Sequence, residues 1–570
     1  MDLSPEKKIA GILVPLFALR GENDLGIGDV AALREFIEWA GAIGFGLVQL
    51  LPINEIGRDN SPYNAISSVA IEPMTLHLAP GSPEELRAGD FETVTSKVNL
   101  TNLRRGSVKY SRVRKLKREL LERAFENFRT QATESRRRGF AEFCDGNSQW
   151  LAPYSFFRAL MEVNGEREAW DEWQPEHRDA ESARAWLGAQ PEAERRHFAA
   201  LENFFCYVQW IAHLQWRELS KFGEERGVAL MGDVPFGISY YSADVFTDRD
   251  IFALDWSGGA PPERYFKDDE FTQKWGQNWG IPLYRWDAMR ACDFQWWRQR
   301  ILGVKRIFHI FRIDHILGFY RIYAFPWRPK ENAEFLPLGW EQMLERTGGR
   351  KPHFAPRDDS TIENCEANRR DGEAYLRVVL EEGGSTRVTG EDLGTVPDYV
   401  RPNLQSLGIA GFKIPQWEVK NGQVIRGENY ERLSVTTYAT HDHQPIRQLW
   451  AEAQDKSSPA AEQARADLFK IAQFASIEPR EGLDYMRDFY PAIMEALFRS
   501  NAWIAVLMIT DLLGRKYRFN VPGTADERNW TRRLSSTVAK LRKSREVRPR
   551  MKSIRDLLEK SGRDVGERSS

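Results

Sequence analysis

The 570-residue sequence is poor in cysteine and has no long apolar run. Its four cysteines, Cys144, Cys206, Cys292 and Cys365, are scattered without a Cys-x-x-Cys pair, which argues against a zinc site and a disulfide framework. No stretch reaches the roughly 18 apolar residues of a membrane span. The start lacks the small-residue cleavage site of a signal peptide. We therefore expect a cytoplasmic protein without a membrane partner.

An excess of charge of either sign is also missing. Lys and Arg number 80 and Asp and Glu 82, so the formal net charge is -2. Without a basic field, no nucleic-acid partner is expected. Aromatic residues, in contrast, are plentiful, with 19 Trp, 32 Phe and 17 Tyr. Most should be core residues, but aromatic faces also stack on sugar rings, which favours a glycan ligand.

Apolar runs that are typical of buried strands recur along the chain, separated by amphipathic segments such as 29–42 and 211–226. The alternation of strand and helix predicts parallel strands joined by right-handed crossovers. Eight runs predict an α/β fold, a (β/α)8 TIM barrel. The runs are 11–19, 47–53, 228–238, 308–315, 386–390, 411–417, 435–440 and 503–509.

The spacing of these runs predicts large insertions in the loops of a single catalytic barrel that spans residues 1–570. The longest, about 75–205, has the composition of a helical subdomain. A second, about 240–300, is rich in Gly, Asp and Trp, lacks periodicity and is expected to form active-site loops. A third, 326–385, carries Pro and charge. Residues 532–570 are expected to form a charged surface helix and a frayed tail.

Three acidic motifs follow three of the predicted strands, and each carries a carboxylate where its strand should end. In the first, Arg312 and Asp314 share one face of a strand because side chains alternate. A nearby cation keeps a carboxylate ionised, as a covalent nucleophile requires. A purely structural Arg–Asp pair is the equally weighted alternative.

In the second motif, Glu391 closes a strand, where burial can raise its pKa and make it a general acid. The alternative is a helix N-terminus, because the pair Glu391 and Asp392 would suit a helix that starts at Leu393. The third motif is His441-Asp442-His443. It could bind a metal, but no further His or Cys cluster accompanies it, so we favour His441 as a donor to sugar hydroxyls.

Other polar and aromatic residues follow predicted strands and have ordinary alternatives. Asp233 could bind a ligand or cap a turn, and Tyr63, after Ser61 and Pro62, could be a stacking platform or a turn aromatic. Arg518 and Asn520 could face the same pocket or be turn residues. Asp511 follows the eighth predicted strand.

Together these motifs resemble the 4-α-glucanotransferases, or amylomaltases, of glycoside hydrolase family 77. The resemblance covers most of the chain. Its motifs are Gly26-Ile27-Gly28-Asp29, Ser61-Pro62-Tyr63, Gly232-Asp233-Val234-Pro235, Ser242-Ala243-Asp244-Val245, Gly259-Ala260-Pro261-Pro262, Gly276-Gln277-Asn278-Trp279-Gly280, the three acidic motifs and Asn520-Val521-Pro522-Gly523-Thr524.

The resemblance implies a (β/α)8 barrel with inserted subdomains and no separate C-terminal β-domain. No cofactor and no metal are expected, because carboxylates can carry both the acid–base and the nucleophilic work. The resemblance also implies roles: Asp314 as nucleophile, Glu391 as general acid/base and Asp442 as the acid that stabilises the transition state. The implied substrate-binding residues are Ser61, Tyr63, Asp233, Trp279, Arg312, His315, Asp392, His441 and Asn520.

The sequence departs from the commoner family form after two of these motifs. Ile281 replaces an Asn, and Ile316-Leu317-Gly318 replaces Phe-Arg-Gly. Both departures leave the three acids in place and bear on the acceptor site and the preferred chain length.

The function that the resemblance implies is the transfer of an α-1,4-glucan segment to the 4-hydroxyl of glucose or an oligosaccharide. The expected partners are therefore α-1,4-glucans and maltooligosaccharides. The alternatives are an α-glucan hydrolase and a catalytically silent glucan-binding protein. The sequence sets no oligomeric state.

Overall fold

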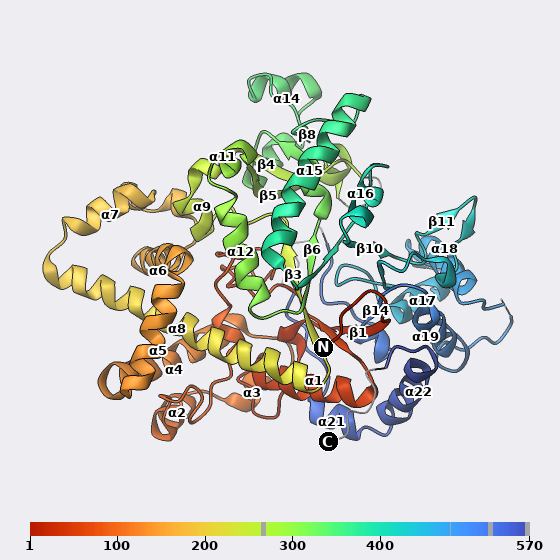
Figure 1. The fold of residues 1–570 in the computed structure, drawn as a ribbon, viewed down its shortest axis with the longest axis horizontal. Coiled ribbons are helices and arrows are strands. Elements are labelled where there is room, and N and C mark those ends of the chain that lie inside the picture. Colours follow the sequence, from red (N-terminus) through yellow and green to blue (C-terminus); the bar gives the residue numbers. More distant parts are fainter. Residues whose placement is uncertain (264–268, 456, 479, 523–527, 565–570) are drawn as a thin grey trace.

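The structure, a computed structural model, describes residues 1–263, 269–455, 457–478, 480–522 and 528–564. Its centre is a closed barrel of eight parallel strands (Figure 1). In order around the barrel these are β1 (Ile9–Leu13), β14 (Ile504–Met508), β13 (Ser434–Thr436), β10 (Ala410–Lys413), β9 (Arg387–Gly390), β6 (Ile310–Asp314), β3 (Ala229–Pro235) and β2 (Leu47–Gln49). The predicted TIM barrel is confirmed, because each predicted run overlaps one of these strands.

Most strands end earlier than the apolar runs that predicted them. β1 stops at Leu13 and β13 at Thr436, whereas the runs extended to residues 19 and 440. The residues after the strands stay buried because inserted segments cover this end of the barrel; after β1, for example, Leu16, Phe17 and Ala18 form a buried 3-10 turn. Hydrophobicity therefore located the strands correctly and overestimated their length.

Helices surround the barrel, and their sequences explain their bounds. α1 (Val30–Ile43) begins where the Asp29 side chain accepts a hydrogen bond from Ala32 N and ends at Gly44, whose φ is 106°. An acidic N-cap and a left-handed glycine are favoured helix boundaries. Further helices beside the barrel are α8 (Glu192–Glu225), α12 (Gln295–Lys305), α15 (Ile362–Gly383), α16 (Val400–Ser406), α17 (Ile446–Gln454), α18 (Ala461–Phe474) and α19 (Tyr490–Arg499).

The alternation of strand and helix is interrupted between β10 and β13. This connection holds a short hairpin, β11 (Val419–Lys420) and β12 (Gln423–Val424), and a 3-10 turn, Gly427–Asn429, and no α-helix.

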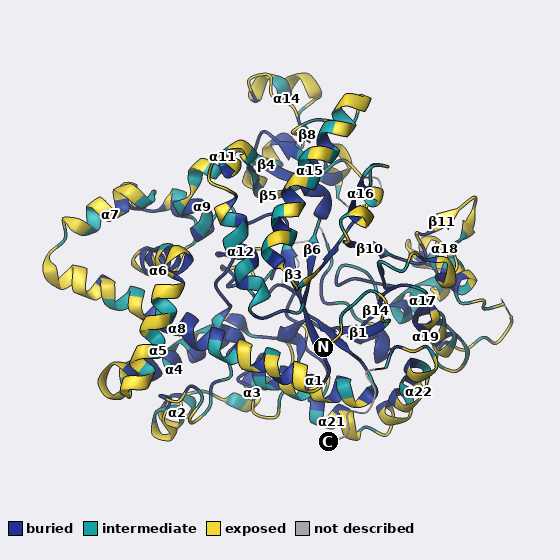
Figure 2. Ribbon diagram, in the orientation of Figure 1, coloured by how far each residue is buried: buried dark blue, intermediate teal, exposed yellow. Residues whose placement is uncertain are grey.

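The stretch between β2 and β3 is helical and lies to one side of the barrel (Figure 1). It contains α2 (Ala88–Thr95), α3 (Leu100–Arg104), α4 (Tyr110–Gln131), α5 (Glu134–Gly146), α6 (Ser148–Val163), α7 (Ala180–Gly188) and α8. We call residues 88–191 the helical insertion. α7 is exposed over much of its surface, whereas the central strands are buried (Figure 2).

The segment that lacked periodicity, about 240–300, supplies two strands of an antiparallel sheet instead of irregular loops. The strands of this sheet, in order, are β5 (Gln277–Tyr284), β4 (Phe252–Ala260), β7 (Ile322–Phe325) and β8 (His353–Ala355), and the last two come from later in the chain. The pairing of β4 with β5 shifts register twice around Gly258. Such bulges break side-chain alternation, which is why no strand was predicted here. Short helices flank the sheet: α9 (Ala243–Thr247), α10 (Glu270–Lys274), α11 (Trp286–Ala291), α13 (Asn332–Phe335) and α14 (Trp340–Arg346).

The C-terminal segment packs more tightly than a surface helix and a frayed tail would. After the short α20 (Ile509–Leu512), α21 (Val538–Lys543) and α22 (Val547–Lys560) bury apolar faces. Arg563 is almost fully buried, and its guanidinium donates to the carbonyl oxygens of Ile9, Phe498, Ser500, Ala502 and Trp503. It thus ties the starts of β1 and β14 together. Residues 565–570 of the predicted tail lie outside the described residues.

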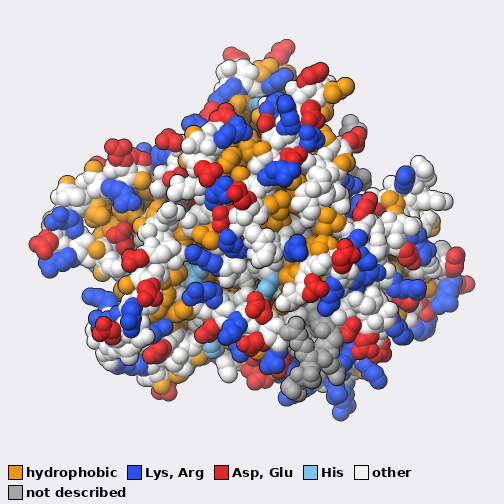
Figure 3. All heavy atoms as spheres, viewed as in Figure 1, with side chains coloured by type: hydrophobic (Ala, Val, Ile, Leu, Met, Phe, Trp, Pro, Cys, Tyr) orange, Lys and Arg blue, Asp and Glu red, His pale blue; other side chains and the backbone are white. Residues whose placement is uncertain are grey.

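Positive and negative side chains are interspersed on the visible face (Figure 3), as the small net charge predicts. No helix of the described residues combines the length and apolar character that crossing a membrane would require.

Candidate active site

A buried ion-pair centre lies at the carboxyl ends of β3 and β6. The strands pair so that Asp233 lies opposite Arg312 and Pro235 opposite Asp314. Arg312 Nη1 donates to Asp233 Oδ1 and Oδ2 at 2.7 and 2.8 Å, and Arg312 Nη2 lies 2.6 Å from Asp314 Oδ1. The predicted Arg312–Asp314 contact is therefore present. One guanidinium holds two carboxylates, which fixes the orientation of Asp314.

Glu391 follows β9 and is held by backbone groups from both sides. Its Oε2 accepts from His315 N at 2.9 Å and its Oε1 from Leu393 N at 2.9 Å. His315 adopts a left-handed conformation with φ of 50°, which turns its N–H toward Glu391. Burial raises the pKa of Glu391 to about 7, and Asp314 adds to this rise against the lowering effect of Arg312. The helix alternative is wrong, since α16 starts only at Val400.

A hydrogen-bonded chain connects the ion-pair centre to Asp442. Tyr63 OH donates to Asp233 Oδ2 at 2.6 Å and lies 3.2 Å from His441 Nδ1. His441 Nε2 lies 3.1 Å from Asp442 Oδ2, and Asn520 Nδ2 donates to Asp442 Oδ1 at 2.6 Å. Because Tyr63 gives its proton to Asp233, its oxygen can accept from His441.

The charges of His441 and Asp442 reinforce each other. Burial alone would raise the pKa of the Asp442 carboxyl, but His441 and Asn520 hold it below its ordinary value. Burial alone would lower the pKa of His441, but Asp442 raises it. Each of the two side chains therefore favours the charged form of the other at this end of the barrel.

The loop that carries Asp442 is anchored from behind by Asp511. Asp511 Oδ1 accepts from Ile446 N, the first residue of α17, at 2.8 Å. Asp511 is 1% exposed, and burial raises the pKa of its carboxyl to about 7. Arg518 Nη2 also donates to the carbonyl oxygen of Asp442.

Trp279 covers this end of the barrel. It is 39% exposed, and its ring meets the His315 ring edge-on with centroids 4.7 Å apart. Tyr63 instead stacks on His441 at 4.8 Å and contacts Trp530 at 6.0 Å, so one face of this predicted platform is already occupied.

Two of the predicted substrate-binding residues, Asp392 and Ser61, are engaged with groups outside the network that joins the three acids. The Asp392 carboxylate accepts from Phe412 N at 2.6 Å and from Arg401 Nε at 2.9 Å, so it points between β9 and β10. Ser61 Oγ accepts from Tyr63 N at 3.3 Å and supports the turn that carries Tyr63. Gly523 and Thr524 of the predicted C-terminal motif lie outside the described residues.

Two tryptophans beside the site were missed as functional candidates. Trp417 is 47% exposed and its ring lies 5.0 Å from the His443 ring. It lies four residues after the end of β10, and an aromatic residue shortly after a barrel strand was the signal. Trp530 lies 5.8 Å from the His441 ring and has φ of 63°, and nothing in its sequence neighbourhood indicated this position.

The residues of the His441-Asp442-His443 triplet are already engaged with protein groups. His443 Nδ1 lies 2.8 Å from Thr440 Oγ1 and accepts from Thr440 N. Within the described ranges, no three His, Cys, Asp or Glu side chains gather as a metal site would require.

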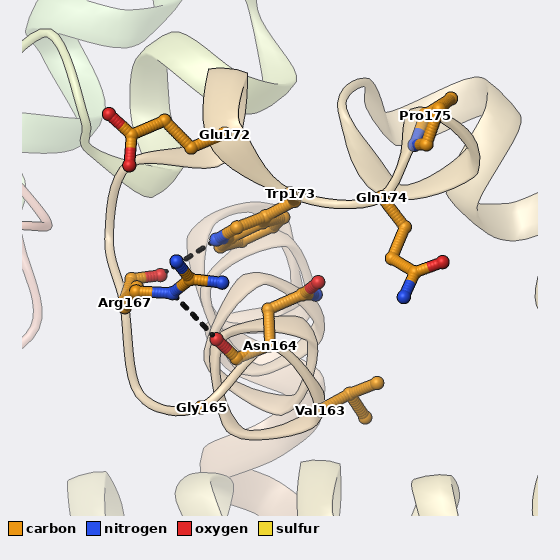
Figure 4. A pocket seen from close by; sticks show the side chains of 8 residues that line it. All are labelled: Val163, Asn164, Gly165, Arg167, Glu172, Trp173, Gln174 and Pro175. Atoms are coloured by element: carbon orange, nitrogen blue, oxygen red, sulfur yellow. Dashed lines mark hydrogen bonds between the residues drawn. The ribbon is translucent and has the colours of Figure 1, made fainter.

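A separate hollow of about 640 Å³ lies at the end of α6 (Figure 4). Trp173 Nε1 donates to the carbonyl oxygen of Arg167, and Arg167 Nε donates to that of Asn164. Glu172 is the only acid in its lining, so it offers no pair of carboxylates.

A parallel barrel with ionisable side chains gathered at the carboxyl ends of its strands has the architecture of a (β/α)8 enzyme. Residues 14–539 match the model of the family described as 4-alpha-glucanotransferase. The chain therefore belongs to glycoside hydrolase family 77, the 4-alpha-glucanotransferases, as its motifs predicted.

Curated relatives and solved structures agree with this family. A 4-alpha-glucanotransferase of Chlamydia pneumoniae is 29% identical over 93% of this chain and 92% of its own. One of Aquifex aeolicus is 28% identical over 90% of this chain and 93% of its own.

The fold is also that of two solved amylomaltases. The amylomaltase of Streptococcus agalactiae, in complex with acarbose, has a TM-score of 0.72 at 20% identity and covers 98% of this chain and 100% of its own. The amylomaltase of Corynebacterium glutamicum has a TM-score of 0.76 at 20% identity and covers 96% of this chain and 75% of its own.

Proposed function

We propose that this 4-alpha-glucanotransferase acts by a retaining double displacement with Asp314 as nucleophile and Glu391 as general acid/base. The observation that carries the proposal is the contrast between the two carboxyls. Asp314 is paired with Arg312 at 2.6 Å, whereas burial raises the pKa of Glu391 to about 7. One carboxyl is thus prepared to attack and the other to carry a proton.

In the first step, an Asp314 oxygen bonds to the anomeric carbon while Glu391 gives its proton to the leaving glycosidic oxygen. In the second step, Glu391 removes the proton from the 4-hydroxyl of the acceptor, whose oxygen displaces Asp314. The product keeps the α configuration. The Asp442 carboxylate stabilises the positive charge that develops on the sugar ring.

The proposed substrates are α-1,4-glucans and maltooligosaccharides in the cytoplasm, without nucleic-acid or membrane partners. Tyr63, Asp233, Arg312 and His441 form the hydrogen-bonded chain around the reacting sugar, and Asn520 orients Asp442. The rings of Trp279 and His315 provide an aromatic surface on the side of Glu391. Ser61 and Asp392 act indirectly, through the backbone groups to which they are hydrogen-bonded.

Trapping the covalent intermediate tests this assignment. An α-maltosyl fluoride donor needs no proton on its leaving group, so Glu391→Gln should still form the glycosyl-enzyme and then stall. Intact-mass measurement should show one added maltosyl group in Glu391→Gln and none in the double variant Asp314→Ala/Glu391→Gln. An adduct that persists in the double variant would remove Asp314 from the nucleophile role.

A further inference from the structure

A stack of four side chains joins the helical insertion to the loop that follows β3 and to the loop that follows β7. Trp170 of the insertion stacks on Tyr240, with centroids 5.1 Å apart and planes 14° apart. Arg249 covers the outer face of Trp170 at 4.3 Å and Arg328 covers Tyr240 at 4.2 Å. Such cation–π contacts add attraction to the buried aromatic area.

An ion pair lies beside this stack. Asp171 Oδ2 accepts from Arg328 Nη2 at 2.7 Å, from Lys330 Nζ at 3.3 Å and from Tyr241 OH at 3.2 Å. The Asp171 and Arg328 side chains are both largely buried. We call Trp170, Asp171, Tyr240 and Arg328 the Trp170 clamp.

The clamp reaches the substrate side of the barrel through residues 327–332. Asn278 Nδ2 donates to the carbonyl oxygen of Trp327 and to Asn332 Oδ1, both at 3.1 Å. Gly280 lies so close to Pro329 that a Cβ atom would come within 2.9 Å of Pro329 Cγ. The two neighbours of Trp279 on β5 therefore both rest on the turn that carries Arg328.

Trp279 itself lies on the acid/base side of the site. Its ring contacts His315, and the backbone N–H of His315 donates to Glu391 Oε2. Because Glu391 exchanges its proton with the leaving and the incoming sugar, Trp279 is placed beside the acceptor sugar.

We propose that the helical insertion positions Trp279 through the Trp170 clamp and so determines how well an acceptor sugar competes with water. This inference rests on the proposed role of Trp279 as a substrate contact. Asp171 and Arg328 are positioning residues, since they act on the acceptor through Trp279. Transfer depends on an acceptor hydroxyl held in attack geometry. If the position of the Trp279 ring is less well defined, the acceptor is held less precisely and hydrolysis is favoured.

The experiment compares Asp171→Asn and Arg328→Met with the parent enzyme on maltotriose. The ratio of transfer to hydrolysis is obtained from glucose release and total reducing ends, and the KM for added acceptor glucose is measured separately. Each variant should lower the ratio about fivefold with little change in the rate of donor consumption. Asp255→Asn is the matched control. Asp255 lies on β4 of the same sheet and pairs with Arg350, outside the clamp. This control should leave the ratio unchanged.

The decisive comparison repeats both substitutions in a Trp279→Ala background. If the clamp acts through Trp279, the substitutions should then change the ratio no further. An equal loss in both backgrounds would overturn the inference, as would an unchanged ratio in both single variants. If Trp279→Ala alone leaves the ratio and the acceptor KM unchanged, its assignment as a substrate contact fails and the inference falls with it. Melting temperatures of all variants separate these results from misfolding.

Discussion

Asp314 and Glu391 end neighbouring strands, yet different groups hold them. Arg312 Nη2 lies 2.6 Å from Asp314 Oδ1, whereas the Glu391 carboxylate accepts from the backbone N–H groups of His315 and Leu393 at 2.9 Å. Burial raises the pKa of Glu391 to about 7 although Arg312 acts to lower it. The two carboxyls therefore differ in their partners, and this difference supports the separate roles proposed for them.

Replacing the proposed nucleophile is the first prediction at this scale. Asp314→Ala should lower turnover by several orders of magnitude, because no other group can form the covalent intermediate. Folding and glucan binding should be largely kept, since Asp314 is partly exposed at the end of its strand. Steady-state rates, a melting curve and calorimetric titration with maltotriose measure these effects. Near-normal turnover in the purified variant would require another nucleophile.

The pKa of Glu391 gives a second prediction. Because burial raises it to about 7, the protonated acid is present below that pH and is lost above it. The rate of glycosyl-enzyme formation should therefore fall about tenfold per pH unit above pH 7. Single-turnover rates with a maltooligosaccharide donor measure this alkaline limb. With α-maltosyl fluoride as donor, Glu391→Gln should show no alkaline decrease in the rate of glycosyl-enzyme formation. A decrease that persists in this variant must come from the titration of another group.

At the scale of elements, the sequence predicted the barrel and failed on the inserted sheet for a physical reason. Barrel strands such as β14 are buried on all sides and appear as continuous apolar runs. β4 is bulged, contains Gly258 and Gly259, and is only partly buried. Its sequence therefore shows neither a continuous apolar run nor an alternation of apolar and polar residues.

The same limit applies to the site. Arg312 and Asp314 could be paired from sequence because they lie on one strand, two residues apart. Trp530, by contrast, contacts Tyr63 although the two residues lie far apart in the sequence. No local sequence pattern predicts such a contact. Asp392 adjoins Glu391 in sequence, but strand alternation turns it toward Arg401, so adjacency to a candidate acid was a poor guide.

The start of α17 gives a prediction at the element scale. The unfolded pKa of Asp511 is about 3.9, and burial raises the folded value to about 7. Between these values the folded state keeps a proton that the unfolded chain has lost, so stability falls as pH rises. Asp511 should contribute a slope of about 1.4 kcal/mol per pH unit in this window.

Asp511→Asn removes this titration, and its amide oxygen can still accept from Ile446 N. Urea unfolding of both proteins at pH 5 and pH 7 measures the effect. The variant should gain stability relative to the parent as pH rises, and parallel profiles would show that Asp511 is ionised throughout.

At the scale of the whole molecule, we propose that the barrel, the inserted sheet and the helical insertion together shape the acceptor side of the site. We expect transfer to outweigh hydrolysis. Water is present at about 55 M, and effective molarities of roughly 10⁵ M or more are reached when a sugar hydroxyl is held in attack geometry.

Incubation with maltotriose measures this directly. Disproportionation releases glucose while the total number of reducing ends stays constant. Reducing ends that rise in step with glucose would identify water as the acceptor and make the enzyme a hydrolase.

The pairing of β1 with β14, secured by Arg563, has a consequence for synthesis on the ribosome. Ile9 pairs with Ile504, so the first strand has no partner on that edge until almost 500 further residues have been translated. At about 5–20 residues per second this takes roughly 25–100 seconds. The contacts of α2–α7 are more local and can form sooner. The nascent chain therefore carries a folded helical unit beside an open strand edge, which is the state that chaperones protect from aggregation.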